Sequence, residues 1–494
     1  MNPLYFVLAA FASLPISVPA LAQQPPSAPL RTKPKEYPPS STPDRVILTW
    51  SGDTSTTQSV TWRTDTSIAT AVGQIAESAP GPSFDPINSK DGGIAAKSFP
   101  AKTEFFKSTS NEAHYHSVTF TGLKPGTKYV YRAGVPGKYG PENEKNFSEW
   151  FQFETASDKP EPFGFIYVGD AQDEIKRHWS RLIRQAYADM PKAKFLLHAG
   201  DLVSSGTSDS QWGEWHAAAG FINGMIPSIP SPGNHEYGSA PKTDEELKLD
   251  AREALVGGGL AEKKKPRPSI VAPNWRAQFT LPEHGPAGLE ETCYYLDVQG
   301  VRIICLNSME RQADQAPWLE NVLKNNPNPW TVITFHVPLY STGANRAKGD
   351  ADKAVRKYWR PIFDRYDVDL VLQGHDHSYG RSGLMRDDNA LIGAKDYDQK
   401  GAVYVVSVSG PKMYELNQQP WMMSSGQKVQ LYQLIRVDGD KLSFEAHTAD
   451  GELYDQFEIH KRKDGAIKLV ERDRIGSERR RYRHRIDCGR AARR

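Results

Sequence analysis

The chain has 494 residues, which is enough for two or three domains. Hydrophobic residues make up 38% and charged residues 24%, as in ordinary globular proteins, and this excludes collagen-like, coiled-coil and wholly disordered chains. With 61 Lys and Arg against 59 Asp and Glu, the net charge of +2 predicts no general attraction to nucleic acid or to anionic membranes.

The N-terminus has the pattern of a secretory signal peptide over residues 1–22. Its apolar stretch, residues 4–14, is too short to span a bilayer, and Ala20 and Ala22 are small residues before a plausible cleavage site. We therefore expect a mature chain without a membrane span, exported to the periplasm or secreted; the alternative is a retained membrane anchor. Residues 23–42 are rich in Pro and Ser and are predicted to be an extended linker.

Residues 43–156 are predicted to form a small β-sandwich that resembles fibronectin type III modules. Short runs of β-branched and aromatic residues alternate there with Gly, Pro, Asp and Asn, as strands alternate with turns. The predicted strands are Val46–Trp50, Ser59–Arg63, Ala113–Phe120, Lys128–Ala133 and Trp150–Glu154.

Residues 161–461 show a different pattern, in which continuous apolar runs alternate with helix-like segments. Glu174–Met190 has apolar residues at helical spacing, and the apolar runs suit strands that are buried on both faces. This alternation predicts a layered α/β domain with a polar insertion at 245–257 and 261–268. The predicted strands are Phe163–Val168, Phe195–His198, Val301–Leu306, Trp330–Thr334, Val368–Leu372, Ala402–Val408, Leu431–Val437, Lys441–His447 and Leu453–His460.

Two further features concern the cysteines and the C-terminus. Cys293 and Cys305 flank a hairpin-like sequence with Gly300 near its turn; they either form a disulfide or, as we favour, pack as two buried thiols.

Residues 462–494 are predicted to be a solvated basic tail, because ten Arg stand against four acidic residues from Glu471 onward. An anionic cell surface or a nucleic acid is the alternative partner of that tail.

Metal-ligand residue types follow several of the predicted buried strands, often directly after a glycine. Open α/β sheets bind ligands beyond the carboxyl ends of their strands, so these side chains are expected to meet in one crevice. A residue without Cβ before the ligand permits close backbone approach in such a crowded site. The candidates are Asp170, Asp201, Asn234, His336, His375 and His377.

The motifs GD, GD, GNHE, H and GHDH, in this order, resemble the calcineurin-like metallophosphoesterases. The preceding sandwich, with PDRVILTW near its start, is similar more narrowly to the purple acid phosphatases and their bacterial relatives. The resemblance covers about residues 43–461. It implies an αββα-type layered metallophosphoesterase domain after a β-sandwich domain.

The same resemblance implies two metal ions in the crevice. Asp170 and His377 would hold the first ion, Asp201 would bridge both, and Asn234, His336 and His375 would hold the second. Nitrogen and oxygen donors without thiolate suit iron, zinc or manganese. His235 would stabilise the transition state or protonate the leaving group, and Glu236 would orient an imidazole or be a surface carboxylate.

Two departures from the family pattern stand out. Purple members have a tyrosinate three residues after the bridging Asp, where this chain has Ser204, so we predict a colourless enzyme. Plant-type members place paired histidines after the residue that matches His336, where this chain has Asn345 and Arg346. Arg346 could bind phosphate. Tyr379 and Arg381 match the stretch after the last ligand and are expected to support the site wall.

The resemblance implies an enzyme that hydrolyses phosphate monoesters by attack of metal-activated hydroxide on a small phosphorylated substrate. The alternatives are a phosphodiesterase or nucleotidase on the same metal core and, from another class, a non-enzymatic cell-surface binding protein. The presence of every metal ligand except the tyrosinate favours the enzyme.

Overall fold

The computed structural model describes residues 36–82, 96–137, 140–239, 268–343, 349–387, 389–390, 400–462 and 466–471. The predicted signal peptide, most of the linker, the polar insertion and most of the basic tail lie outside these residues. Among the described residues, no helix is long and apolar enough to cross a membrane.

The N-terminal part of the described chain consists of two four-stranded antiparallel sheets. Apolar side chains from both sheets, among them Trp62, Val118, Phe120 and Tyr131, pack into one core. The five predicted strands are present, and β3, β4 and β5 are additional. One sheet has the order β1 (Asp44–Thr49), β2 (Gln58–Thr64), β6 (Glu112–Phe120), β5 (Lys102–Lys107); the other β4 (Lys97–Pro100), β3 (Val72–Glu77), β7 (Lys128–Gly134), β8 (Phe151–Glu154).

The larger domain contains two mixed sheets. The first has seven strands in the order β11 (Ser228–Pro230), β10 (Leu196–His198), β9 (Phe163–Val168), β22 (Leu431–Asp438), β23 (Lys441–Thr448), β24 (Leu453–Lys461), β25 (Ile467–Glu471). The second has the order β14 (Tyr294–Val298), β15 (Val301–Cys305), β16 (Trp330–Phe335), β17 (Leu370–Gln373), β20 (Ala402–Val406), β18 (Tyr379–Arg386), β19 (Asn389–Ala390), and β21 (Met422–Gly426) pairs with β18. A separate pair is β12 (Tyr237–Ser239) with β13 (Ser269–Val271).

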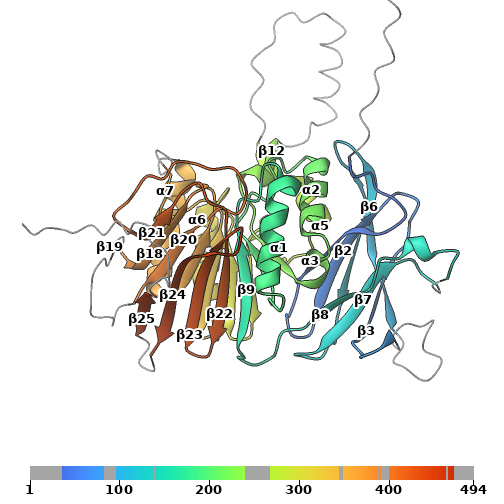
Figure 1. Ribbon diagram of the computed structural model, residues 1–494, viewed down its shortest axis with the longest axis horizontal. Helices are drawn as coiled ribbons and strands as arrows, with labels where there is room; N and C mark the ends of the chain where they lie inside the picture. The colour runs from blue at the N-terminus through green and yellow to red at the C-terminus, as the bar shows by residue number, and fades with distance from the viewer. Residues whose placement is uncertain are drawn as a thin grey trace, which may run out of the picture. The chain divides into compact units, whose positions relative to one another are not determined.

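The alternation of side chains along β15 shows how the layers stack. Ile303 lies in the core that also contains β9 and α1, whereas its neighbour Ile304 lies in the core that contains α6 and α8. Each sheet is therefore covered by helices on its outer face, and the expected αββα architecture is confirmed (Figure 1). The helices are α1 (Ser180–Asp189), α2 (Asp209–Ala219), α3 (Ile222–Met225), α5 (Pro273–Gln278), α6 (Gln312–Lys324), α7 (Asp350–Tyr358) and α8 (Arg360–Arg365).

Three local predictions can be compared with the structure. The helix predicted over Glu174–Met190 begins instead with a π-helical turn, η3 (Ile175–Trp179), which continues into α1. Cys293 and Cys305 are both buried free thiols beside the predicted hairpin, β14–β15. The tail was predicted to begin at residue 462, but β25 pairs with β24 and extends the sheet to Glu471.

Buried polar contacts join the sandwich to the larger domain within one compact unit. Asp209, at the start of α2, has a side chain that is 2% exposed. It accepts hydrogen bonds from Arg45 of β1 at 2.9 Å, from Arg63 of β2 at 3.4 Å and from Asn111 at 2.7 Å. Removing this carboxylate would leave the buried guanidinium of Arg45 without a carboxylate partner, whereas Arg63 would keep its ion pair with Asp44 at 2.6 Å.

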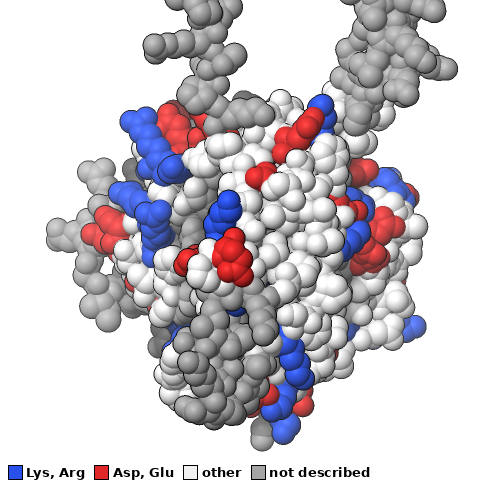
Figure 2. Space-filling view, turned by 90° about the vertical axis from the view of Figure 1, so that its right-hand side faces the viewer, with Lys and Arg blue, Asp and Glu red and all other residues white. Residues whose placement is uncertain are grey.

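Charges of both signs are interspersed on the face shown in Figure 2. Among the described residues of that face, Lys and Arg lie next to Asp and Glu and form no continuous basic surface. This distribution agrees with the near-neutral net charge of the whole chain.

Asp209→Ala is expected to lower the free energy of unfolding by about 3–5 kcal/mol, because it breaks a buried ionic network by removing one partner. Asp314→Ala is the matched control, since Asp314 pairs with Arg311 at the surface, and its loss should cost about 0–1 kcal/mol. Urea unfolding of the two variants and the wild type measures both values. Equal stabilities of the two variants would contradict the structural role of Asp209.

Candidate metal centre

The carboxyl ends of parallel strands from both sheets meet at one edge of the larger domain. Parallel pairing of β9, β10 and β11, and of β15, β16, β17 and β20, aligns these ends. Asp170 follows β9, Asp201 follows β10, His336 directly follows β16, and His375 and His377 follow β17. Asn234 begins a short 3₁₀ turn after β11. All six side chains predicted from the sequence lie at this edge.

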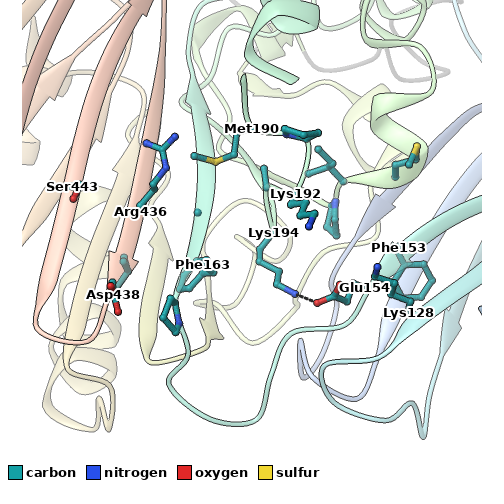
Figure 3. Close-up of a pocket in the computed structure, with 18 of the residues that line it drawn as sticks. Lys128, Phe153, Glu154, Phe163, Met190, Lys192, Lys194, Arg436, Asp438 and Ser443 are labelled. Carbon is teal, nitrogen blue, oxygen red and sulfur yellow. Dashed lines mark hydrogen bonds and ion pairs between the residues drawn. The ribbon is translucent and has the colours of Figure 1, made fainter. Parts of the chain in front are cut away.

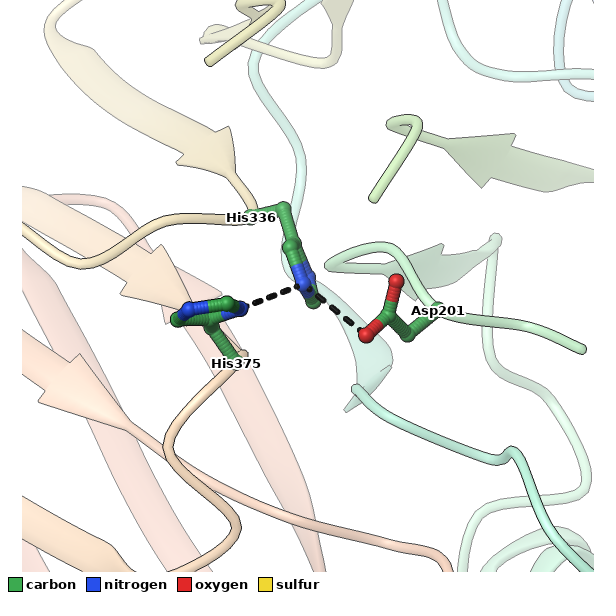
Figure 4. Close-up of side chains that lie close together, drawn as sticks. All are labelled: Asp201, His336 and His375. Carbon is green, nitrogen blue, oxygen red and sulfur yellow. Dashed lines mark hydrogen bonds and ion pairs between the residues drawn. The ribbon is translucent and has the colours of Figure 1, made fainter. Parts of the chain in front are cut away.

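Four of these side chains form one tight group, and Figure 4 shows three of them, Asp201, His336 and His375. His336 Nε2 lies 3.0 Å from Asp201 Oδ2, and His375 Nδ1 lies 3.1 Å from His336 Nε2. The side-chain oxygen of Asn234 lies 3.1 Å from His336 Nε2 and 2.9 Å from His375 Nδ1. Nitrogen and oxygen electron pairs thus converge on one point.

A second group shares Asp201 with the first. Side-chain ligand atoms of Asp170, Asp201 and His377 all lie within 4.8 Å of one another, as do those of Asp201, His336 and His375. All three members of the second group are buried. Two adjacent three-residue groups with a common carboxylate have the composition of a dinuclear metal site.

Hydrogen bonds on the far side of the rings fix two of the imidazoles. His336 Nδ1 lies 2.9 Å from the carbonyl oxygen of Ala199, and His377 Nδ1 lies 2.9 Å from that of Lys412. Because a carbonyl only accepts hydrogen bonds, each Nδ1 carries the proton. The Nε2 atoms of both rings therefore face the cluster, and each offers an electron pair to a cation when it carries no proton, as metal-binding histidines require.

The charge balance of the cluster calls for additional positive charge. Burial raises the pKa of Asp170 well above its usual range. Burial also acts on Asp201, but the adjacent His336 keeps the pKa of Asp201 below its usual value. Burial would lower the pKa of His336, yet Asp201 and Asp170 outweigh it and raise that pKa to about 9. One imidazolium compensates only one of two buried carboxylates, so the donor set fits bound metal cations.

The backbone at this edge adopts conformations that are uncommon for residues with a side chain. Asp170, Asp201, His375 and His377 all have positive φ, between 47° and 75°. Such residues persist where the surrounding structure holds them, and they cluster at functional sites. Here they turn the chain sharply as it leaves each strand, which directs the side chains back over the strand ends.

Two glycines are required by close approach of the backbone to the cluster. A Cβ on Gly233 would lie 2.2 Å from Asp201 Oδ1, and one on Gly374 would lie 2.4 Å from Asp170 Oδ2. Any other residue would displace a carboxylate, which agrees with the reason given for glycine in the sequence motifs.

Glu236 is fully buried, but it does not orient an imidazole as we expected. Its carboxylate accepts hydrogen bonds from four backbone N–H groups, those of Asp201, Leu202, Val203 and Gly233, at 2.7–3.3 Å. The side chain therefore holds the backbone of two ligand-bearing loops together. Both earlier interpretations, a partner of a histidine and a surface carboxylate, are wrong.

His235 lies beside the cluster with its ring partly exposed. Its Nδ1 lies 2.7 Å from the carbonyl oxygen of Ser204, and its Nε2 lies 3.9 Å from Asp201 Oδ2. The ring thus presents Nε2 at the solvent side of the cluster. Ser204, at the position of the family's tyrosinate, directs its hydroxyl to the carboxylate of Asp173.

The remaining predicted site residues are not part of this cluster. Tyr379 donates to Asp455 at 2.7 Å, and Arg381 pairs with Asp455 and with Glu471 of β25. Both side chains are buried in contacts between the two sheets, so the prediction that they support the site wall is replaced by a role in sheet packing. Asn345 and Arg346 lie outside the described residues.

Gln172 is a residue of the cluster that the sequence analysis missed. Its amide nitrogen lies 3.1 Å from Asp201 Oδ2 and 2.9 Å from His377 Nε2. The available signal was its position two residues after Asp170, in the loop that carries the first predicted ligand.

A cavity of about 710 Å³ lies elsewhere in the molecule (Figure 3). It is lined by Phe163 at the start of β9 and crossed by the ion pair of Lys194 with Glu154 at 2.7 Å. Asp170 follows the other end of β9, and a strand of six residues is about 20 Å long. This cavity is therefore separate from the metal-ligand cluster.

Comparisons with known proteins agree with these observations. The family model of the purple acid phosphatase N-terminal domain matches residues 43–155, and that of the calcineurin-like phosphoesterases matches residues 165–379. Purple acid phosphatase 21 of Arabidopsis thaliana is 28% identical over 55% of this chain and 54% of its own length. Purple acid phosphatase 1 of Ipomoea batatas is 26% identical over 55% of this chain and 52% of its own length.

The fold also matches a solved structure, that of purple acid phosphatase PPD1 from yellow lupin (Lupinus luteus) seeds. The TM-score is 0.66 at 17% sequence identity, over 86% of this chain and 75% of that chain. The chain spans about half the length of the two curated relatives described above. The two matched domains, in this order and with this fold, show that the chain belongs to the purple acid phosphatase-like members of the calcineurin-like phosphoesterases.

Proposed function

We propose that the chain is a dinuclear-metal hydrolase that cleaves phosphate monoesters. The observation that carries this proposal is the carboxylate of Asp201, which belongs to both groups of metal-ligand side chains. Asp170 and His377 would hold the first ion, and Asn234, His336 and His375 the second. Iron, zinc and manganese suit these oxygen and nitrogen donors.

Two bound cations would supply an activated water near neutral pH and would offset negative charge on the phosphoryl oxygens. The residues of the chain would position this chemistry. Glu236 fixes the backbone of Asp201 and of Gly233, and the hydrogen bonds of His336 and His377 to carbonyl oxygens keep their Nε2 atoms directed inward. These contacts support a site that is organised before substrate binds.

His235 is proposed to act on the leaving group. Its Nδ1 donates to the Ser204 carbonyl, which fixes the ring with Nε2 near Asp201 and on the solvent side. From there a protonated ring could donate to the leaving alkoxide, or stabilise negative charge on the phosphoryl group in the transition state.

The proposal also covers the colour of the enzyme, its export and the alternative substrate class. The enzyme is expected to be colourless, since Ser204 stands where a tyrosinate would give charge transfer to ferric iron. Residues 1–22 would direct export, to the periplasm or the outside of the cell. A phosphodiesterase or nucleotidase on the same metal core is the second candidate, because the outer pocket rather than the metal core decides how many phosphate charges are accepted.

Asp201→Ala is expected to abolish both metal binding and turnover, because it removes the shared ligand. Elemental analysis of the purified variant should show loss of both ions relative to the wild type, and p-nitrophenyl phosphate turnover should fall to background. The exposed carboxylate variant Asp314→Ala should retain both properties. Two ions bound to a folded Asp201→Ala variant would contradict the bridging role.

His235→Ala is expected to retain both ions and lose turnover by on the order of 10²–10⁴-fold, the usual effect of one acid–base or charge-stabilising group. The hydrogen bond from the backbone N–H of residue 235 to Asp201 does not depend on the side chain, so the loop should keep its shape. His178→Ala, at an exposed histidine of η3, is the control. Wild-type rates in His235→Ala would exclude the proposed role.

Substrate class is tested with the wild-type protein. We expect kcat/KM for p-nitrophenyl phosphate to exceed that for bis(p-nitrophenyl) phosphate by roughly tenfold or more, which corresponds to about 1.4 kcal/mol of transition-state stabilisation. Rates should be measured at several pH values with each candidate metal restored after chelation. A faster diester rate would favour the phosphodiesterase, and a folded protein that binds no metal and hydrolyses neither ester would favour a binding protein.

A further inference from the structure

The side chain of Gln172 occupies the space between two candidate ligands of the first metal ion. The residue is 0% exposed and lies just after the Asp170 loop. Its Nε2 contacts Asp201 Oδ2 at 3.1 Å and His377 Nε2 at 2.9 Å. Its side-chain oxygen, Oε1, is also buried and has no hydrogen-bond partner.

The direction of these hydrogen bonds shows that the side-chain amide of Gln172 stands where a cation would bind. His377 Nδ1 donates to the Lys412 carbonyl, so its Nε2 has an electron pair and accepts from Gln172. Asp201 Oδ2 accepts as well. The two amide protons therefore point to the two electron pairs that a cation would use. A cation bound there would exclude the amide protons from this position.

Rotation about the last side-chain bond of Gln172 exchanges its oxygen and nitrogen. In the absence of a cation the oxygen would face two other electron pairs, which is unfavourable, and this explains why it is turned away without a partner. With a cation present the same rotation would give the buried oxygen its missing partner. An unpaired buried oxygen is costly, so binding and rotation would favour one another.

We propose that Gln172, through its side-chain oxygen, is a neutral ligand of the first metal ion, together with Asp170, Asp201 and His377. This inference rests on the proposed dinuclear function. The Ser204 hydroxyl is engaged by Asp173, since it donates to the Asp173 carboxylate and its oxygen accepts from the Asp173 N–H at 3.0 Å. A neutral amide in place of an anionic ligand leaves less negative charge around the ion, which favours a divalent over a trivalent cation in this site.

The test measures Zn²⁺ binding to the full chain after chelation, by equilibrium dialysis and elemental analysis. We expect two ions per chain in the wild type. In Gln172→Ala we expect the affinity of one ion to fall by about 10–100-fold, as when a group that supports a metal site is removed. Gln172→Glu, which keeps an oxygen at the same reach, should restore two ions and shift the preference toward Fe³⁺.

Gln433→Ala is the matched control for loss of a buried glutamine. Gln433 is also 0% exposed, lies in β22 and has an unpaired Oε1, but its amide nitrogen donates to Ser407 Oγ and not to a metal ligand. We expect it to lower thermal stability and to leave both Zn²⁺ ions bound. Loss of one ion in this variant too would assign the effect of Gln172→Ala to general loosening and overturn the proposal.

A second measurement follows Zn²⁺ binding in the wild-type protein and uses a variant only to assign one signal. In wild-type protein labelled with ¹⁵N-glutamine, addition of Zn²⁺ should shift one side-chain amide signal, identified by its absence in Gln172→Glu. No shift of that signal, or two ions bound with unchanged affinity in Gln172→Ala, would overturn the role of Gln172 while leaving the proposed function intact. Fewer than two ions in the wild type would overturn both.

Discussion

Burial of two carboxylates at one end of the sheets is the constraint on which the site depends. Asp170 and Asp201 are at most 1% exposed, and the single imidazolium at His336 offsets only part of their charge. Leaving such groups unpaired in a protein interior is costly unless a cation or a proton accompanies them. The arrangement is therefore stable as a binding site for cations, and the remaining contacts of this edge hold the donors in place.

Glu236 stabilises the two loops that carry part of this arrangement. A carboxylate that accepts four backbone N–H groups fixes the loop after β10 to the loop after β11, although burial raises its pKa to about 7. The positive φ of Asp201 and the contact between Gly233 and Asp201 belong to the same junction. The hydrogen bonds to Glu236 thus stabilise a strained stretch of backbone and hold the Asp201 carboxylate in place.

The sequence was sufficient to predict the layers and the six converging side chains, because apolar runs followed by Gly and a ligand-type residue reflect local chemistry at strand ends. It was insufficient for side chains whose roles depend on distant partners. Arg381 binds Asp455 and Glu471, which are 74 and 90 residues away, so its motif neighbours suggested the wrong role. Glu236 was misread for the same reason, since its partners are backbone groups that carry no residue-specific signal.

One connection between the sandwich and the metal-ligand cluster runs through the loop of residues 202–208. One end of this loop follows Asp201 and is held by Glu236; the other leads into α2, where Asp209 binds Arg45 and Arg63 of the sandwich. Thr109 of the sandwich also donates to the carbonyl oxygen of Thr207 within the loop. Because the loop is held at both ends, the sandwich restricts the position of the Asp201 carboxylate, which both groups share. In this chain the N-terminal domain therefore acts as a structural support of the metal-ligand cluster.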